Sequence, residues 1–311
     1  MIRVLALVAI AASLLSCSSD VDLPQVTPLL VSLTAIEQQS QALKFSRGDF
    51  QVITEEVVLL DERRNLEIPL RLFYPSEARP FPVLLFSHGN WSDNTKYDNI
   101  IHFWVSHGYA VIAPYHADGG GMARGIFNSL RYGQLGLIQQ RADDFIVILD
   151  YFPEFEQIAP DFSQRMDRSI VAATGHSFGA FTAQQMRGAA AFNPDAESPD
   201  QAWQTSRETR IKAVVAISPP GPMFDVITEN SWQKFQGPAL LTTGTWDVNA
   251  QFWPQWQLHK MSFDKAVPGD QFALVVEGAD HYFGNLICRP ERDVPPQESA
   301  LAIVNDVSLV F

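Results

Sequence analysis

The chain has 311 residues, of which 46% are apolar and 18% charged, and its formal net charge is −13. A chain of this length can bury a substantial core, as one large domain or as two smaller ones. Because its Lys and Arg residues are not clustered, the acidic balance argues against nucleic acid as a partner.

The N-terminus has the pattern of an export signal. Arg3 supplies one positive charge before the apolar run Val4–Leu15, which is shorter than the ~20 residues that span a bilayer. The Leu-Leu-Ser-Cys ending at Cys17 resembles a bacterial lipobox, in which the cysteine is lipid-modified and becomes the mature N-terminus. We therefore expect residues 1–16 to be a signal peptide and Cys17 to carry a membrane anchor.

The residue after the cysteine indicates the membrane. In proteins of this type an aspartate there favours the inner membrane, so Ser18 implies the outer membrane, on its periplasmic or surface face. A plain secretory signal that releases the protein into the periplasm, or a buried first strand, are the alternatives. Residues 17–48 are expected to be a tether with a weak helix over Pro28–Leu43.

The pattern beyond the tether predicts one α/β domain over residues 49–311. Two β-rich runs, Gln51–Leu60 and Leu66–Tyr74, flank a charged turn and predict an antiparallel hairpin. From Phe81 onward, short apolar strands alternate with helical stretches, which is typical of a parallel sheet covered on both faces. With the hairpin this makes about eight strands. The expected parallel strands are Pro82–Phe86, Ala110–Pro114, Ile170–Thr174, Ala213–Ile217, Ala239–Thr243 and Phe272–Glu277.

Helices and loops fill the intervals between these strands. Two stretches, His116–Gly133 and Arg187–Arg210, are rich in Gly, Pro, Asn and Asp, and we expect them to be loops. The link between Ile217 and Ala239 is too short for a large helical lid. The expected helices are Lys96–Ser106, Leu135–Tyr151, Phe178–Arg187, Pro254–Met261 and Glu298–Phe311.

The most informative motif is G-x-S-x-G at residues 175–179, centred on Ser177. It directly follows a predicted buried strand and precedes a helix that starts with small residues. A serine in such a corner sits on a strained turn with its hydroxyl exposed at the edge of the sheet. This context predicts that Ser177 is the nucleophile of a serine hydrolase.

A nucleophilic serine needs a base, and the base needs an orienting acid. With the chain order serine, acid, histidine, the candidate bases are His259 and His281. His281 lies in a loop just beyond the last predicted strand, where the base is expected. His259 lies within a helical pattern, and we expect it to be a surface side chain.

The orienting acid is predicted to be Asp247. It follows the strand Ala239–Thr243 and a glycine turn, which is the expected placement. Asp280 is the alternative because it directly precedes His281, although adjacent side chains in a loop usually diverge.

Acyl transfer also needs backbone N–H donors aimed at the developing oxyanion. One is expected at Phe178, directly after the nucleophile. The other is expected in the loop after the strand Pro82–Phe86, at Asn90, with Trp91 as the alternative. His88 in the same loop is expected to pack beneath the site.

Four segments together resemble α/β-hydrolases of the platelet-activating-factor acetylhydrolase and dienelactone-hydrolase-like group. They are Phe86–Gly89, Ala113–His116, the motif at 175–179, and Gly278–His281. The resemblance covers residues 52–311 and implies a single-domain α/β-hydrolase fold. Tyr115, where the group often has an aspartate, and Ala180, where a second glycine is common, depart from its pattern and leave the substrate open.

The resemblance also implies the site. It carries the triad onto Ser177, Asp247 and His281, and the oxyanion donors onto Phe178 and Asn90.

Other features complete the expectation. Trp91, Trp246 and Tyr282 neighbour these residues and are expected to line an apolar substrate pocket. Since no H-E-x-x-H, paired-cysteine or G-x-x-x-x-G-K motif occurs, we expect neither a metal nor a cofactor. Cys288 is expected to be a small buried residue.

The sequence therefore predicts an enzyme that cleaves a small-molecule or lipid ester through an acyl-enzyme intermediate. Two alternatives remain open. A protein with this fold could be a non-catalytic lipoprotein that binds an envelope component, or the same triad could cleave an amide or peptide bond.

Overall fold

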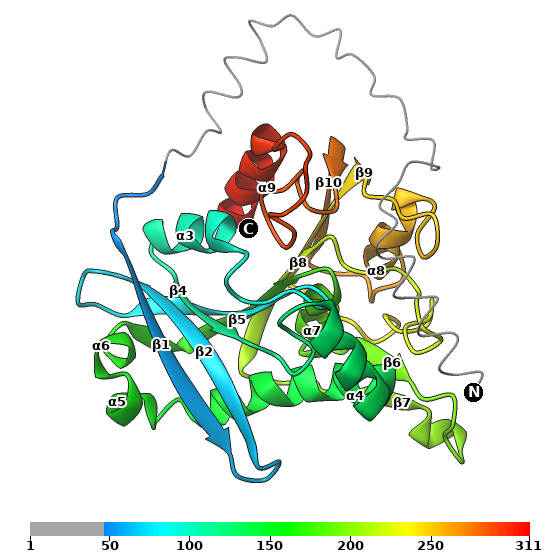
Figure 1. Cartoon of the computed structure of the whole chain (residues 1–311), viewed down its shortest axis with the longest axis horizontal. Coiled ribbons are helices and arrows are strands. Elements are labelled where there is room, and N and C mark those ends of the chain that lie inside the picture. The colour runs from blue at the N-terminus through cyan, green and yellow to red at the C-terminus, as the bar shows by residue number, and fades with distance from the viewer. Residues whose placement is uncertain (1–46) are drawn as a thin grey trace, which may run out of the picture.

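A computed structural model describes residues 47–311 of the chain as one α/β domain (Figure 1). The predicted signal peptide, Cys17 and the helix expected over Pro28–Leu43 lie outside the described residues. Within the range 47–311, no helix is both long and apolar enough to cross a membrane.

The core of the domain is an eight-stranded sheet with the strand order β1-β2-β4-β3-β5-β8-β9-β10. As the hairpin prediction requires, β1 pairs antiparallel with β2; β2 also pairs antiparallel with β4, and the remaining pairings are parallel. The mostly parallel sheet of about eight strands is thus confirmed. The strands are β1 (Val52–Asp61), β2 (Leu66–Pro75), β3 (Phe81–Ser87), β4 (Ala110–Pro114), β5 (Met166–His176), β8 (Ile211–Ile217), β9 (Ala239–Trp246) and β10 (Gln271–Asp280).

Helices cover both faces of this sheet (Figure 1). On one face α3 (Asp98–Ser106) and α9 (Glu298–Val310) pack together over an apolar cluster that includes Trp104 and Leu301. On the other face α4 (Met122–Asp150) and α7 (Phe178–Gln185) bury a larger cluster around Phe145. This two-sided burial explains why strands such as β4 are apolar at every position. Two short helices, α5 (Phe155–Ile158) and α6 (Pro160–Ser163), precede β5.

The loop predicted over His116–Gly133 was wrong for most of its length. Helix α4 already begins at Met122 and is interrupted at Gly133, whose φ of 67° is not helical. The glycine that suggested a loop instead separates two helical segments, because it tolerates a left-handed backbone at little cost.

Two further stretches differ from the prediction. The predicted loop Arg187–Arg210 contains an antiparallel ribbon of β6 (Ala190–Phe192) and β7 (Trp203–Thr205), with the 3₁₀ turn Pro199–Gln201 between them. The helix expected over Pro254–Met261 is a 3₁₀ turn, Trp256–Lys260, followed by the short α8 (Met261–Asp264). Local composition cannot show a ribbon, because the pairing partner lies elsewhere in the chain.

The strand order leaves a crevice for a binding site at the carboxyl ends of β3 and β5. β4 and β5 lie on opposite sides of β3, so the loops that leave the carboxyl ends of β3 and β5 diverge. A crevice at such a switch point is the usual binding position in an open α/β sheet. The segment between β8 and β9 contains no helix, as predicted, so no large helical lid is inserted there.

Candidate active site

Ser177 stands in a strained turn between β5 and α7. Its φ of 55° and ψ of −124° lie in a region that side chains other than glycine rarely adopt. Backbone hydrogen bonds hold the turn: the Ser177 N–H donates to the Ile217 carbonyl at 2.9 Å, and the Ser177 carbonyl accepts the Ala180 N–H at 2.9 Å. The turn therefore fixes the hydroxyl at the carboxyl edge of the sheet.

The two motif glycines are needed because backbone segments meet there without room for a side chain. A Cβ on Gly179 would lie 2.0 Å from the Ser87 carbonyl oxygen, and a Cβ on Gly175 would lie 2.4 Å from the Gly179 carbonyl oxygen. Close approach of the β5–α7 turn to the end of β3 thus requires glycine at both positions.

The structure brings the three predicted triad residues into one hydrogen-bonded chain. Ser177 Oγ lies 2.8 Å from His281 Nε2, and His281 Nδ1 lies 2.7 Å from Asp247 Oδ1. The Thr243 hydroxyl donates to the other Asp247 oxygen at 3.0 Å. Asp247 directly follows β9 and His281 directly follows β10, so the ends of three parallel strands supply the chain.

The expectation that His259 is a surface side chain was wrong. It is fully buried; its Nδ1–H donates to the Pro219 carbonyl at 2.7 Å, and its Nε2 lies 2.9 Å from Asp247 Oδ1. The 3₁₀ turn that replaces the expected helix directs this ring inward. Asp247 therefore contacts two histidines.

The alternative acid, Asp280, has a different role. Its Oδ1 accepts the backbone N–H groups of Tyr282 and Gly284, and its Oδ2 pairs with Arg292 at 2.9 Å. Asp280 thus shapes the loop that carries His281.

Burial and charge set the protonation states in this chain. Burial alone would raise the pKa of the Asp247 carboxyl, but His259 and His281 outweigh it and hold that pKa well below its usual value. Burial lowers the pKa of the His281 imidazole, and this effect is larger than the increase that Asp247 causes. At neutral pH the arrangement is an ionised Asp247 beside a neutral His281, which can accept a proton.

The two predicted oxyanion donors lie beside the serine. Phe178 is the first residue of α7, and the first N–H groups of a helix have no acceptor within that helix. Asn90 lies in the loop after β3, where Arg289 donates to its carbonyl at 3.0 Å. Both residues line the same pocket as Ser177.

That pocket has a volume of about 660 Å³, within the usual range for small-molecule sites. All eight residues predicted for the catalytic chain, the oxyanion site and the aromatic wall line it: Asn90, Trp91, Ser177, Phe178, Trp246, Asp247, His281 and Tyr282. Trp253, which the sequence offered as either a pocket or a core residue, also lines it and stacks on the His281 ring at a centroid distance of 6.0 Å.

A further chain of hydrogen bonds ties three of the site's loops together. The His176 Nε2–H donates to the His281 carbonyl at 2.7 Å, so its Nδ1 accepts from the Tyr97 hydroxyl at 3.1 Å. The Tyr97 oxygen in turn accepts the Gly89 N–H at 2.8 Å. His176, which occupies the first x of the G-x-S-x-G motif, thus connects the turn of Ser177 with the loop of His281 and with the loop after β3.

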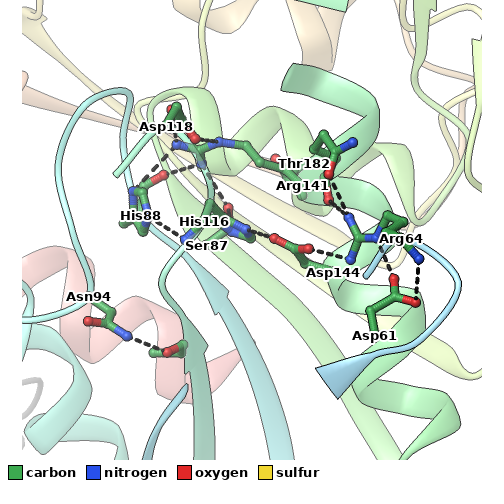
Figure 2. Close-up of polar contacts among 12 residues, drawn as sticks. Asp61, Arg64, Ser87, His88, Asn94, His116, Asp118, Arg141, Asp144 and Thr182 are labelled. Carbon is green, nitrogen blue, oxygen red and sulfur yellow. Dashed lines mark hydrogen bonds and ion pairs between the residues drawn. The ribbon is translucent and has the colours of Figure 1, made fainter. Parts of the chain in front are cut away.

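A second serine–histidine–aspartate array begins at Ser87, the last residue of β3 (Figure 2). Ser87 Oγ is 2.8 Å from His116 Nε2, and His116 Nδ1 is 2.7 Å from Asp144 Oδ2. These distances match those of the first array, yet Ser87 is fully buried and does not line the pocket. Its oxygen also accepts an N–H from Arg141 at 3.1 Å. The two serines therefore differ in whether they line the pocket and not in their distance from a histidine.

Within residues 47–311, one group of side chains is close enough to share a metal ion: Asp247, His259 and His281, whose ligand atoms lie within 4.8 Å of one another. Both ring nitrogens of His281 already have partners, because this residue bridges Asp247 and Ser177. We assign no metal to them. Cys288 is buried, as predicted.

Solved structures with a similar overall fold identify the fold class of the chain. A protein described as a dienelactone hydrolase from Klebsiella pneumoniae superposes with a TM-score of 0.57 at 15% identity, covering 83% of this chain and 98% of that one. A dienelactone hydrolase from Anabaena variabilis gives 0.52 at 18%, covering 84% and 98%. A ferulic acid esterase from Streptomyces cinnamoneus gives 0.56 at 16%, covering 85% and 88%. The chain has the α/β-hydrolase fold.

Sequence comparison gives a more local likeness. The family model of chlorophyllase matches residues 40–121. Chlorophyllase type 0 from Chenopodium album is 36% identical over 70 residues, which are 22% of this chain and 20% of that protein. The family match includes Asn90 and ends before Ser177.

Replacing Gly179 by Ala should destabilise the domain by about 3 kcal/mol, because the new methyl group would meet the backbone of Ser87. The control is Gly136→Ala in α4, where the nearest atom at 3.2 Å is the Tyr132 Cβ. We expect the control to stay within about 1 kcal/mol of the wild type. Denaturant unfolding measures both; equal stabilities of the two variants would contradict the close-approach argument.

Proposed function

We propose that the protein is a serine hydrolase that cleaves carboxylic esters through an acyl-enzyme intermediate. The observation that carries this proposal is the hydrogen-bonded chain Ser177–His281–Asp247 in a pocket of about 660 Å³. The fold shared with dienelactone hydrolases and a ferulic acid esterase supports it.

The proposed chemistry begins with attack of Ser177 Oγ on the ester carbonyl carbon while His281 Nε2 accepts the hydroxyl proton. Asp247 stabilises the imidazolium, and the N–H groups of Phe178 and Asn90 bind the oxyanion. Collapse of the tetrahedral intermediate breaks the ester C–O bond, and His281 protonates the leaving alkoxide. Water then attacks the acyl-enzyme with His281 again as base, which releases the carboxylic acid and restores Ser177. These steps require no cofactor.

The pocket wall supports a small-molecule or lipid ester with an apolar group. Trp91, Trp246, Trp253 and Tyr282 provide aromatic surface beside the proposed reaction centre. Aromatic side chains offer a large contact area to acyl or alcohol groups without requiring a charge on the substrate.

Ser177→Ala should lower kcat for p-nitrophenyl acetate by at least about 10⁴-fold, because His281 would then have no hydroxyl to deprotonate. Ser169→Ala, on the exposed part of the same strand β5, is the matched control and should keep wild-type activity. Hydrolysis that survives the loss of Ser177 would refute the assignment. Wild-type protein inert towards esters would favour a binding role, and preference for p-nitroanilides over esters would favour amide cleavage.

The activity should depend on pH through His281. Because burial lowers its pKa, kcat/KM for an uncharged ester should rise with pH along a single ionisation whose midpoint lies below 6.5, the usual value for histidine. Asp247, whose pKa is held well below its usual value, should stay ionised across this range. Initial rates over about pH 4–9 measure the profile. A midpoint above 6.5 would contradict the burial argument.

For the location of the enzyme we propose a lipid anchor at Cys17 in the outer membrane. The lipobox-like ending at residues 14–17 and Ser18 after it support this proposal. In bacterial cells fed a radiolabelled fatty acid, the wild-type chain should incorporate label and fractionate with membranes, while Cys17→Ser should do neither. Wild-type protein that is processed without incorporating label would instead favour secretion into the periplasm.

A further inference from the structure

Arg141 of α4 is a buried cation that the proposed chemistry does not use. Its side chain is 1% exposed, and it pairs with Asp118 in a bidentate contact, Nε to Oδ1 at 2.9 Å and Nη2 to Oδ2 at 2.7 Å (Figure 2). Burial would raise the pKa of Asp118, but Arg141 outweighs it and lowers that pKa to about 2. Asp118 is therefore ionised at neutral pH.

The remaining N–H groups of Arg141 reach the loop that follows β3. Nη1 donates to the His88 carbonyl at 2.5 Å and to Ser87 Oγ at 3.1 Å, and Nη2 donates to the Gly89 carbonyl at 3.2 Å. A guanidinium has five N–H donors in a planar fork, and here each has an acceptor. Arg141 thus fixes the last residue of β3 and the first two residues of the loop relative to Asp118.

The contact with Gly89 determines where the proposed oxyanion donor points. The Gly89 carbonyl and the Asn90 N–H belong to one peptide unit, and a trans peptide directs them to opposite sides. The carbonyl is also held by the His88 Nδ1–H at 2.8 Å. With the carbonyl held on the side of Arg141, the Asn90 N–H must face the other way.

The guanidinium also reaches the second proposed donor. It lies 5.0 Å from the centre of the Phe178 ring, a cation–π distance. One buried side chain therefore contacts the Gly89 carbonyl in one segment of the proposed oxyanion site and the ring of Phe178 in the other.

The buried array behind the loop holds this arrangement. Since Ser87 Oγ accepts from Arg141, the Ser87 hydroxyl donates to His116, whose Nδ1–H contacts Asp144. Arg64, from the turn between β1 and β2, closes the network by pairing with Asp144 at 2.6 Å. The loop is thus tied to the turn between β1 and β2 through hydrogen bonds that run from His116 through Asp144 to Arg64.

We propose that Arg141 is a positioning residue that orients the Gly89–Asn90 peptide so that the Asn90 N–H faces the oxyanion. This inference rests on the proposed ester hydrolysis. A lysine in its place would keep the charge but not the planar fork, so it could not hold Asp118, His88 and Gly89 together.

The test compares three variants with the wild type in the hydrolysis of p-nitrophenyl acetate and in inhibition by phenylboronic acid, whose serine adduct places an oxygen in the oxyanion site. Arg141→Lys removes the fork. Asp118→Asn keeps the shape of the side chain but removes its charge, which weakens its hold on the Arg141 guanidinium. The matched control is Arg187→Lys, because Arg187 holds the carbonyls of Ile211, Gln236 and Gly237 near the amino ends of β8 and β9, away from the pocket.

We expect kcat to fall about 10- to 100-fold in Arg141→Lys, with KM within about threefold and boronate affinity falling with kcat. Asp118→Asn should show a smaller loss of the same kind, and Arg187→Lys neither. Folded Arg141→Lys with kcat and boronate affinity like those of the control would overturn the inference. If that variant does not fold, as judged by circular dichroism, unchanged values in Asp118→Asn would overturn it. A wild type without esterase activity would refute the proposed function, and with it the role of Arg141.

Discussion

The arrangement of the site depends on one constraint, the close approach of the β5–α7 turn to the end of β3. A serine at positive φ and two glycines without side chains let the backbone of residues 175–179 contact Ser87 and His88. This contact places the Ser177 hydroxyl, the first N–H of α7 and the loop after β3 around one point. His281 and Asp247 reach the same point because β9 and β10 are parallel to β5 and end at the same edge.

Two serine–histidine–aspartate arrays occur in the domain, so hydrogen-bond distances alone do not identify a nucleophilic serine. Both arrays have a serine within 2.8 Å of a histidine and an aspartate 2.7 Å beyond it. Ser87 is enclosed and accepts a hydrogen bond from a cation, whereas Ser177 faces a pocket and stands on a strained turn. Nucleophilic chemistry requires room for a carbonyl carbon beside the serine, and of the two serines Ser177 lines the pocket whereas Ser87 does not.

Sequence reasoning predicted most of the sheet because the parallel strands are continuous apolar runs that need no partner to be recognised. It also placed Ser177, Asp247 and His281 at strand ends, where the structure now brings them together. It was wrong for His259 because a helical pattern says nothing about a 3₁₀ turn that packs against Asp247.

Other parts of the site had no local signal at all. Arg141 and Asp118 are 23 residues apart, and a charged residue within a helix pattern is normally solvated. The hydrogen bond from His176 to the carbonyl of His281 joins residues 105 apart. Such contacts follow from how the strands are ordered in the sheet, which composition and periodicity do not encode.

The most direct test of the central claim is to treat the wild-type protein with a fluorophosphonate and locate the adduct by peptide mass spectrometry. An activated serine beside an oxyanion site reacts with such reagents, whereas a serine without a base does not. We expect a single adduct on Ser177 that forms faster as His281 loses its proton. No adduct on Ser177, or an adduct on Ser87 instead, would contradict it.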